Sequence, residues 1–184
     1  MTLWLDTSVL VSLYVPEAKS ERVARLVRRT GEPIPFSQLH ELELVNALRL
    51  RVFRRDARRK QVDATLARIG NDLDAGILRR VAIDWPGALA KAIELADRHT
   101  SRLGCRSLDV LHVSAAMMSA SSRFVTADRR QSTVARRAGL APGYGFGERK
   151  LMCQVVRGQP GVGASVQAGM GTVFAQGLHR GQVE

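Results

Sequence analysis

Two short apolar runs near opposite ends of the chain each lead into an acidic residue. Residues 2–5 precede Asp6, and residues 123–127 precede Asp128. A short apolar run of this kind is typical of a buried strand, and in open α/β sheets ligands bind outside the carboxyl ends of the strands. The sequence therefore predicts that both acids come to one edge of one sheet. Turns and helix N-caps use the same residue types, so either acid alone also fits a purely structural role.

Two further acids lie inside apolar helical patterns. Glu43 lies within residues 42–48, and Asp109 lies within residues 106–112. A carboxylate on a core-facing stretch of helix is costly unless it is paired or bound to a metal ion. The four acids together therefore suggest one shared cation site. Glu41 is expected in solvent instead, because residues two apart on a helix point to different sides.

A group of four carboxylates fits the hydrolysis of phosphodiester bonds. Carboxylates hold Mg²⁺ or Mn²⁺, which bind oxygen ligands and keep water molecules available. Without such an ion, mutual repulsion is expected to raise some of the carboxyl pKa values. His112 follows Asp109 by one helical turn, and it is either a further ligand or a structural residue; oxygen-ligand sites rarely need imidazole, which favours the structural role. The residues predicted to orient the carboxylates or water are Thr7, Ser8, Asn46 and Thr126.

The bulk properties point to a basic globular domain. The chain has 184 residues with a formal net charge of +11, which favours a polyanionic partner, although an acidic protein would also fit. The two cysteines, Cys105 and Cys153, have no zinc-type spacing, so reduced thiols and a cytoplasmic protein are expected. No apolar run is long enough to span a membrane. One exposed basic cluster is expected, formed by Arg54, Arg55, Arg58, Arg59 and Lys60.

The acids must be positioned by alternating strands and helices. After the first strand, further strands are expected at residues 34–36, 77–83 and 124–127, and helices at residues 17–29, 37–55, 56–75, 86–99 and 129–138, with one more helix beginning at residue 107. Residues 101–106 are expected to form a loop. Residues 1–142 are predicted to form a nuclease-like domain. Residues 143–184 are Gly-rich and without a clear period, so an irregular or mobile tail is expected there and a closing strand is in doubt.

Residues 1–140 resemble the PIN-domain ribonucleases, and most closely the VapC-like toxins of type II toxin–antitoxin systems. The resemblance rests on four motifs in the family's order, namely Leu5-Asp6-Thr7-Ser8, Glu43-Leu-Val-Asn46, Arg106-Ser-Leu-Asp109-Val-Leu-His112 and Phe124-Val-Thr126-Ala-Asp128-Arg-Arg-Gln131. It implies a three-layer α/β/α fold with a central, mainly parallel sheet of four to five short strands. It also implies a Mg²⁺- or Mn²⁺-dependent ribonuclease, a VapB-like antitoxin as partner, and a homodimer. The residues implied as metal ligands and catalytic groups are Asp6, Glu43, Asp109 and Asp128.

Three other functions fit parts of the sequence. A stand-alone PIN-type RNA-processing nuclease would use the same acids. A non-catalytic RNA-binding module would explain the charge, but aromatic residues are only 5% and no stacking platform is visible. A phosphatase with an aspartyl nucleophile would need a second Asp two residues after Asp6, where Ser8 stands. The RNA target stays open, because transfer, ribosomal and messenger RNA would all meet a basic groove.

Overall fold

The computed structural model describes residues 2–143. The predicted Gly-rich tail therefore lies, from residue 144 onward, outside the described residues. Within them five short strands form two sheets, and every strand pair is parallel. One sheet has the strand order β1–β4–β5, and the other consists of β2 and β3. The strands are β1 (Leu3–Leu5), β2 (Ile34–Phe36), β3 (Leu78–Arg80), β4 (Arg123–Val125) and β5 (Ala141–Pro142).

The register of β1 and β4 brings the first and last acid-bearing segments to one edge. Leu5 pairs with Val125, and the Asp6 amide donates a hydrogen bond to the Val125 carbonyl at 2.8 Å. Since parallel strands in register end at the same level, Asp6 and the segment after Val125 leave the sheet together. This confirms the predicted sharing of one sheet edge.

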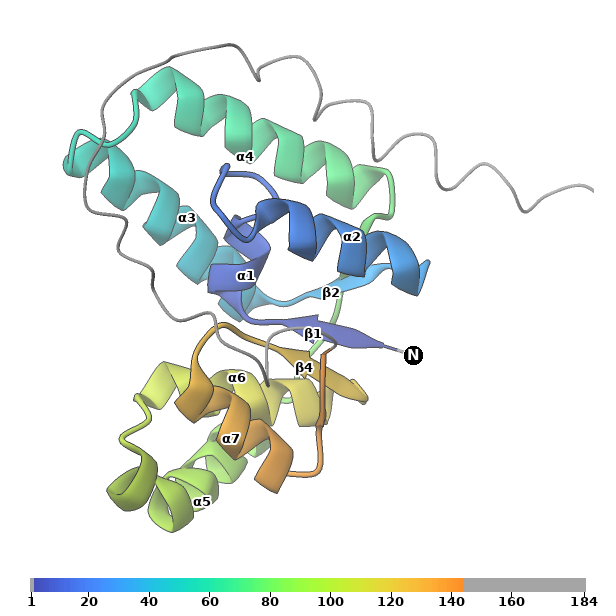
Figure 1. Ribbon diagram of the computed structural model, residues 1–184, viewed down its shortest axis with the longest axis vertical. Helices are drawn as coiled ribbons and strands as arrows, with labels where there is room; N and C mark the ends of the chain where they lie inside the picture. Colours follow the sequence, from blue (N-terminus) through green and yellow to red (C-terminus); the bar gives the residue numbers. More distant parts are fainter. Residues whose placement is uncertain (1, 144–184) are drawn as a thin grey trace, which may run out of the picture. The chain divides into compact units, whose positions relative to one another are not determined.

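Seven helices of the described chain cover the strands from two sides. Figure 1 shows α1 to α4 on one side and α5 to α7 on the other, which gives the predicted three layers and a parallel sheet of few strands. The helices are α1 (Thr7–Val11), α2 (Ser20–Thr30), α3 (Gln38–Phe53), α4 (Arg59–Asp74), α5 (Trp85–Leu103), α6 (Ser107–Met118) and α7 (Arg129–Arg137). None of the helices within residues 2–143 is both long and apolar enough to cross a membrane.

Strands β1 and β2 and the two apolar residues of β4 are buried, because helices cover both of their faces. Trp4 and Leu5 of β1 are completely buried, and Phe124 of β4 is 3% exposed. A parallel strand covered on both sides has no solvent face, so the usual alternation of polar and apolar residues disappears. Burying each large apolar side chain of this kind contributes about 1.5–3 kcal/mol. The core thus fixes the sheet edge at which the acids stand.

Three predicted helix boundaries are wrong. Helix α2 begins at Ser20 and not at residue 17, after a turn in which the Ser20 hydroxyl accepts from the Glu17 amide at 2.8 Å. Helix α4 begins at Arg59 and is not capped by Asp56; instead the Gln61 side chain accepts from the Arg58 amide at 2.8 Å. Helix α5 continues to Leu103, through half of the predicted loop, because the first glycine able to end it in a left-handed conformation is Gly104, with φ of 65°.

Two further features differ from the expectations. The closing strand that seemed doubtful is present, since Ala141 and Pro142 of β5 pair with β4. The short helix α1 was not predicted, because four of its five residues are Thr, Ser or Val, which are weak helix formers. Its existence depends on Asp6, which caps it.

Candidate functional site

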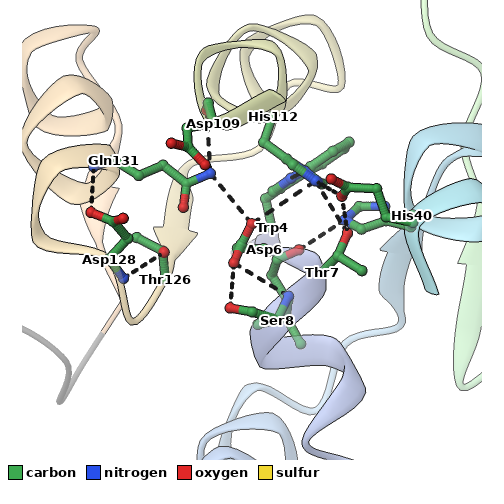
Figure 2. A network of polar contacts seen from close by, with 12 residues as sticks. Trp4, Asp6, Thr7, Ser8, His40, Asp109, His112, Thr126, Asp128 and Gln131 are labelled. Atoms are coloured by element: carbon green, nitrogen blue, oxygen red, sulfur yellow. Dashed lines mark hydrogen bonds and ion pairs between the residues drawn. The ribbon is translucent and has the colours of Figure 1, made fainter. Parts of the chain in front are cut away.

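Asp6 stands at the carboxyl end of β1 and begins helix α1. Its oxygen Oδ2 accepts hydrogen bonds from the Ser8 hydroxyl at 2.5 Å and from the Ser8 amide at 3.3 Å. The other oxygen, Oδ1, accepts from Nε2 of Gln131 at 3.3 Å. Only 14% of the Asp6 side chain is exposed. Figure 2 shows this carboxylate between the side chains of α6, α7 and α1.

Glu43 reaches the same region from α3. Its oxygen Oε2 accepts from the Thr7 hydroxyl at 2.6 Å and lies 2.5 Å from Nε2 of His112. Burial raises the pKa of the Glu43 carboxyl, but the hydrogen bonds from His112 and Thr7 outweigh it, so that the pKa lies below its usual range. Glu41, two residues earlier, instead pairs with Arg80 at 2.7 Å on the outside of the helix, as its spacing predicts.

His112 lies between the two carboxylates and is 1% exposed. Its Nε2 is 3.9 Å from Oδ1 of Asp6, in addition to the close contact with Glu43. Its other ring nitrogen, Nδ1, lies 3.3 Å from the indole nitrogen of Trp4. The sequence favoured a structural role for this histidine, but the structure places it in contact with a candidate site residue.

Asp109 and Asp128 stand at the N-terminal ends of α6 and α7. The Asp109 carboxylate accepts from the Arg106 amide at 2.9 Å, which makes it part of a capping box. Asp128 accepts from the amides of Arg130 at 2.7 Å and Gln131 at 3.3 Å, and it pairs with the Arg130 side chain at 3.1 Å. The hydrogen bond from the Arg130 side chain is the main cause that lowers the pKa of Asp128.

Gln131 connects three of these segments and was not predicted as a site residue. Its side chain is 1% exposed, and its Nε2 donates both to Asp6, at 3.3 Å, and to the backbone carbonyl of Asp109, at 3.2 Å. A buried amide of this kind is costly unless it is hydrogen-bonded. Gln131 thereby ties the end of β1 to the start of α6.

Three of the four residues predicted to orient the acids touch them. Thr7 donates to Glu43, and Ser8 donates to Asp6. The Thr126 hydroxyl accepts from the Asp128 amide at 3.0 Å, which fixes the backbone that carries this carboxylate. Asn46 is exposed on α3, and among the described residues no hydrogen bond joins it to an acid.

The rise in carboxyl pKa values that was expected for some of the acids does not occur at two of them. The pKa values of Glu43 and Asp128 both lie below their usual range. The reason is that each carboxylate accepts hydrogen bonds from donors of the chain itself, and these outweigh the rise that burial alone would cause. The site is thus an arrangement in which protein donors hold the carboxylates in place.

His40 packs against the buried side of the site, and it was not among the site residues predicted from the sequence. It is completely buried, and its ring centroid lies 4.5 Å from that of Trp4 and 5.2 Å from that of His112. Its Nδ1 accepts from the Ser37 amide at 3.1 Å, and its Nε2 lies 2.8 Å from the Leu5 carbonyl. Burial lowers the pKa of His40 to about 3. It therefore joins the start of α3, which carries Glu43, to the end of β1, which carries Asp6.

The four predicted metal ligands are carboxylates, and their oxygen atoms are of the chemical type that binds a hard divalent cation. Carboxylate oxygens are the ligands that Mg²⁺ and Mn²⁺ prefer. In the part of the chain that the structure describes, however, no group of three or more histidine, cysteine, aspartate or glutamate side chains is close enough to hold one ion. Two carboxylates, those of Asp6 and Glu43, approach the same point on His112. Gln131 links the backbone carbonyl of Asp109, and not its carboxylate, to Asp6.

The comparison with known families agrees with the fold. Residues 3–137 match the PIN domain family, and the chain belongs to that family. Its members are generally metal-dependent nucleases. No curated protein matches the chain.

Proposed function

We propose that this protein is an endoribonuclease that uses Mg²⁺ or Mn²⁺ held by Asp6, Glu43, Asp109 and Asp128. The observation that carries the proposal is the approach of Asp6 and Glu43 to one buried point at the carboxyl end of β1, 3.9 and 2.5 Å from Nε2 of His112. Ligands of α/β folds bind at this end of the strands. Membership of the PIN domain family supports nuclease chemistry there.

The chain's own residues would orient the reacting groups. A bound divalent ion supplies positive charge for the phosphate and a water molecule of lowered pKa. Ser8 and Gln131 hold the two oxygens of Asp6, while Thr7 and His112 hold Glu43. These contacts fix the direction of each carboxylate before RNA binds, which reduces the reorganisation that cleavage requires.

Removal of divalent ions is expected to abolish the activity. The full chain should cleave a labelled RNA with a single-stranded loop in the presence of Mg²⁺ or Mn²⁺, and EDTA should stop cleavage until excess Mg²⁺ is added back. The physical reason is that carboxylates alone offer no positive charge to the phosphate. The measurement is the initial rate on a denaturing gel. Full activity in EDTA would exclude the metal mechanism.

We further propose that the nuclease is the toxin of a toxin–antitoxin pair in the cytoplasm, held inactive by a VapB-like antitoxin. The basic cluster, formed by Arg54, Arg55, Arg58, Arg59 and Lys60, is exposed at the junction of α3 and α4 and would meet acidic residues of such a partner. Co-expression with a small protein encoded by the neighbouring gene should relieve the growth arrest that this protein causes and should yield a complex of the two. If it does neither, the toxin hypothesis fails, and a stand-alone RNA-processing nuclease becomes the proposed function. The homodimer implied by the resemblance also stays a prediction.

Charge reversal in the basic cluster should slow antitoxin binding. The double substitution Arg58→Glu and Arg59→Glu is expected to lower the association rate about tenfold at low salt and to change the dissociation rate much less. Surface plasmon resonance at several salt concentrations measures both rates. Arg28→Glu with Arg29→Glu, on exposed positions of α2, is the matched control with the same change in net charge. Equal slowing by both pairs would show that only overall charge matters.

A further inference from the structure

The buried side chains Trp4 and His112 form a connected pair beneath Glu43. Trp4 belongs to β1 and is completely buried, and His112 belongs to α6 and is 1% exposed. The indole nitrogen of Trp4 lies 3.3 Å from Nδ1 of His112, and Nε2 of His112 lies 2.5 Å from the Glu43 carboxylate. Figure 2 shows Trp4 and His112 next to each other, close to Asp6 and Thr7. Three elements distant in sequence therefore meet in one line of polar contacts.

The tryptophan determines which ring nitrogen of His112 carries the proton. An indole N–H donates a hydrogen bond and accepts none, so Nδ1 of His112 must be the acceptor. In a neutral imidazole the proton then resides on Nε2, which faces Glu43. The Thr7 hydroxyl donates to the same Glu43 oxygen at 2.6 Å. Two donors thus fix one oxygen of the Glu43 carboxylate.

Simple packing does not account for this arrangement. Burying an imidazole, an indole N–H and part of a carboxylate costs free energy unless every polar atom is paired, and an apolar contact would fill the same space without that cost. The pairing is also directional, because a histidine with its proton on Nδ1 would oppose the Trp4 donor and offer none to Glu43. His112 is, in addition, the residue on which Asp6 and Glu43 converge.

We infer that Trp4 and His112 are positioning residues for Glu43: Trp4 fixes the tautomer of His112, and His112 directs the Glu43 carboxylate toward Asp6. The inference rests on the nuclease site proposed above and deepens it. Both side chains are buried, so a bound substrate would not reach them. The same interaction pattern, in which a fixed histidine orients a ligand carboxylate, affects activity about 10- to 100-fold where it supports a metal site.

The first test measures positioning without reference to activity. In the ¹⁵N- and ¹³C-labelled chain, Nδ1 of His112 should give the signal of an unprotonated ring nitrogen and Nε2 that of a protonated one. Trp4→Phe should shift both His112 nitrogens and the carboxyl carbon of Glu43. His40 provides an internal control, since its tautomer is fixed by the Ser37 amide and the Leu5 carbonyl. A proton on Nδ1 in the unmodified chain, or an unmoved Glu43 signal in the variant, would overturn the inference.

The second test separates positioning from packing. His112→Gln keeps an N–H near the place of Nε2, whereas His112→Asn keeps polar atoms only near Nδ1. His112→Asn should lower kcat about 10- to 100-fold with KM for RNA unchanged, and His112→Gln should retain most of kcat. Equal effects of both substitutions would mean a structural role only, and so would losses confined to KM.

A matched tryptophan variant controls for the loss of an indole. Trp85→Phe removes the only other tryptophan, whose N–H donates to Gln38 at 2.7 Å away from the acids, and it should leave kcat and the Glu43 signal unchanged. If the unmodified chain cleaves no RNA, the proposed function fails, while the His112 and Glu43 signals still decide the positioning. If Trp4→Phe does not fold, the carboxyl-carbon signal of Glu43 is compared between His112→Gln and His112→Asn. A change in His112→Asn alone supports the positioning role of His112, and an equal change in both variants contradicts it.

Discussion

Asp6→Asn is expected to lower the rate of RNA cleavage at least about a thousandfold while the chain stays folded. Each factor of ten in rate corresponds to about 1.4 kcal/mol, and a ligand carboxylate at a divalent ion carries several kcal/mol of charge stabilisation. The fold should persist because Asn is as good an N-cap as Asp, so the contact with the Ser8 amide survives. The amide nitrogen of Asn would then face the donor Nε2 of Gln131, so this hydrogen bond is lost, at a cost of about 1 kcal/mol.

The measurement combines single-turnover cleavage with denaturant unfolding of the same preparation. Asp63→Asn is the matched control, because Asp63 pairs with Arg49 at 2.5 Å on the surface of α3 and α4 and belongs to no candidate site. Its cleavage rate should equal that of the unmodified chain. Normal cleavage by Asp6→Asn would refute the assignment of the four acids.

His40→Met should lower the free energy of unfolding by about 2–5 kcal/mol and flatten its dependence on pH. The substitution replaces the imidazole by an apolar side chain of similar size and leaves the buried Ser37 amide and Leu5 carbonyl without their partner, at about 1–3 kcal/mol each. Because His40 joins the start of α3 to the end of β1, activity should fall with the loss of stability.

The pH dependence follows from the lowered pKa of His40, about 3 in the folded chain against the ordinary 6.5. Below pH 6.5 the unfolded chain binds a proton at this histidine and the folded chain does not. The free energy of unfolding should therefore fall as the pH is lowered from 6.5 to 5, with a slope approaching about 1.4 kcal/mol per pH unit. Urea unfolding at several pH values measures this slope. His99→Gln, at a partly exposed histidine of α5, should keep the slope, and a slope that also persists in His40→Met would assign it to another group.

The fold could be predicted from the sequence because its signals are local. Ile34–Phe36 is bounded by turn residues on one side and by the helix cap Ser37 on the other, and the strand occurs at the predicted positions. The boundaries of α4 and α5 were harder, because Asp56 and the residues after His99 have ordinary capping or loop character. Contacts elsewhere and the position of a glycine decide where those helices begin and end.

The acids could be predicted, but their partners could not. Asp6 and Asp128 follow recognisable strands, so the sheet edge places them. His112 and Gln131 meet the acids across separations of 69 and 125 residues, and no local pattern encodes such a meeting. One signal was present in the sequence. His112 follows Asp109 by three residues, and Gln131 follows Asp128 by three residues; this spacing places the two side chains of each pair on the same face of a helix. The lowered pKa values of Glu43 and Asp128 depend on these distant donors and on the local capping contacts.

Three of the four acids also begin helices. Asp6 caps α1, Asp109 completes the capping box of α6, and Asp128 caps α7. Replacing a capping Asp by Ala costs about 1 kcal/mol, whereas Asn, Ser or Thr keep most of the cap. Selection for folding alone would therefore retain Asp, Asn, Ser or Thr at the N-cap positions of Asp6 and Asp128 in a relative without the proposed nuclease activity. Glu43 lies inside α3 and caps nothing, so on the proposed function its presence would distinguish an active relative from an inactive one better than Asp6 and Asp128 would.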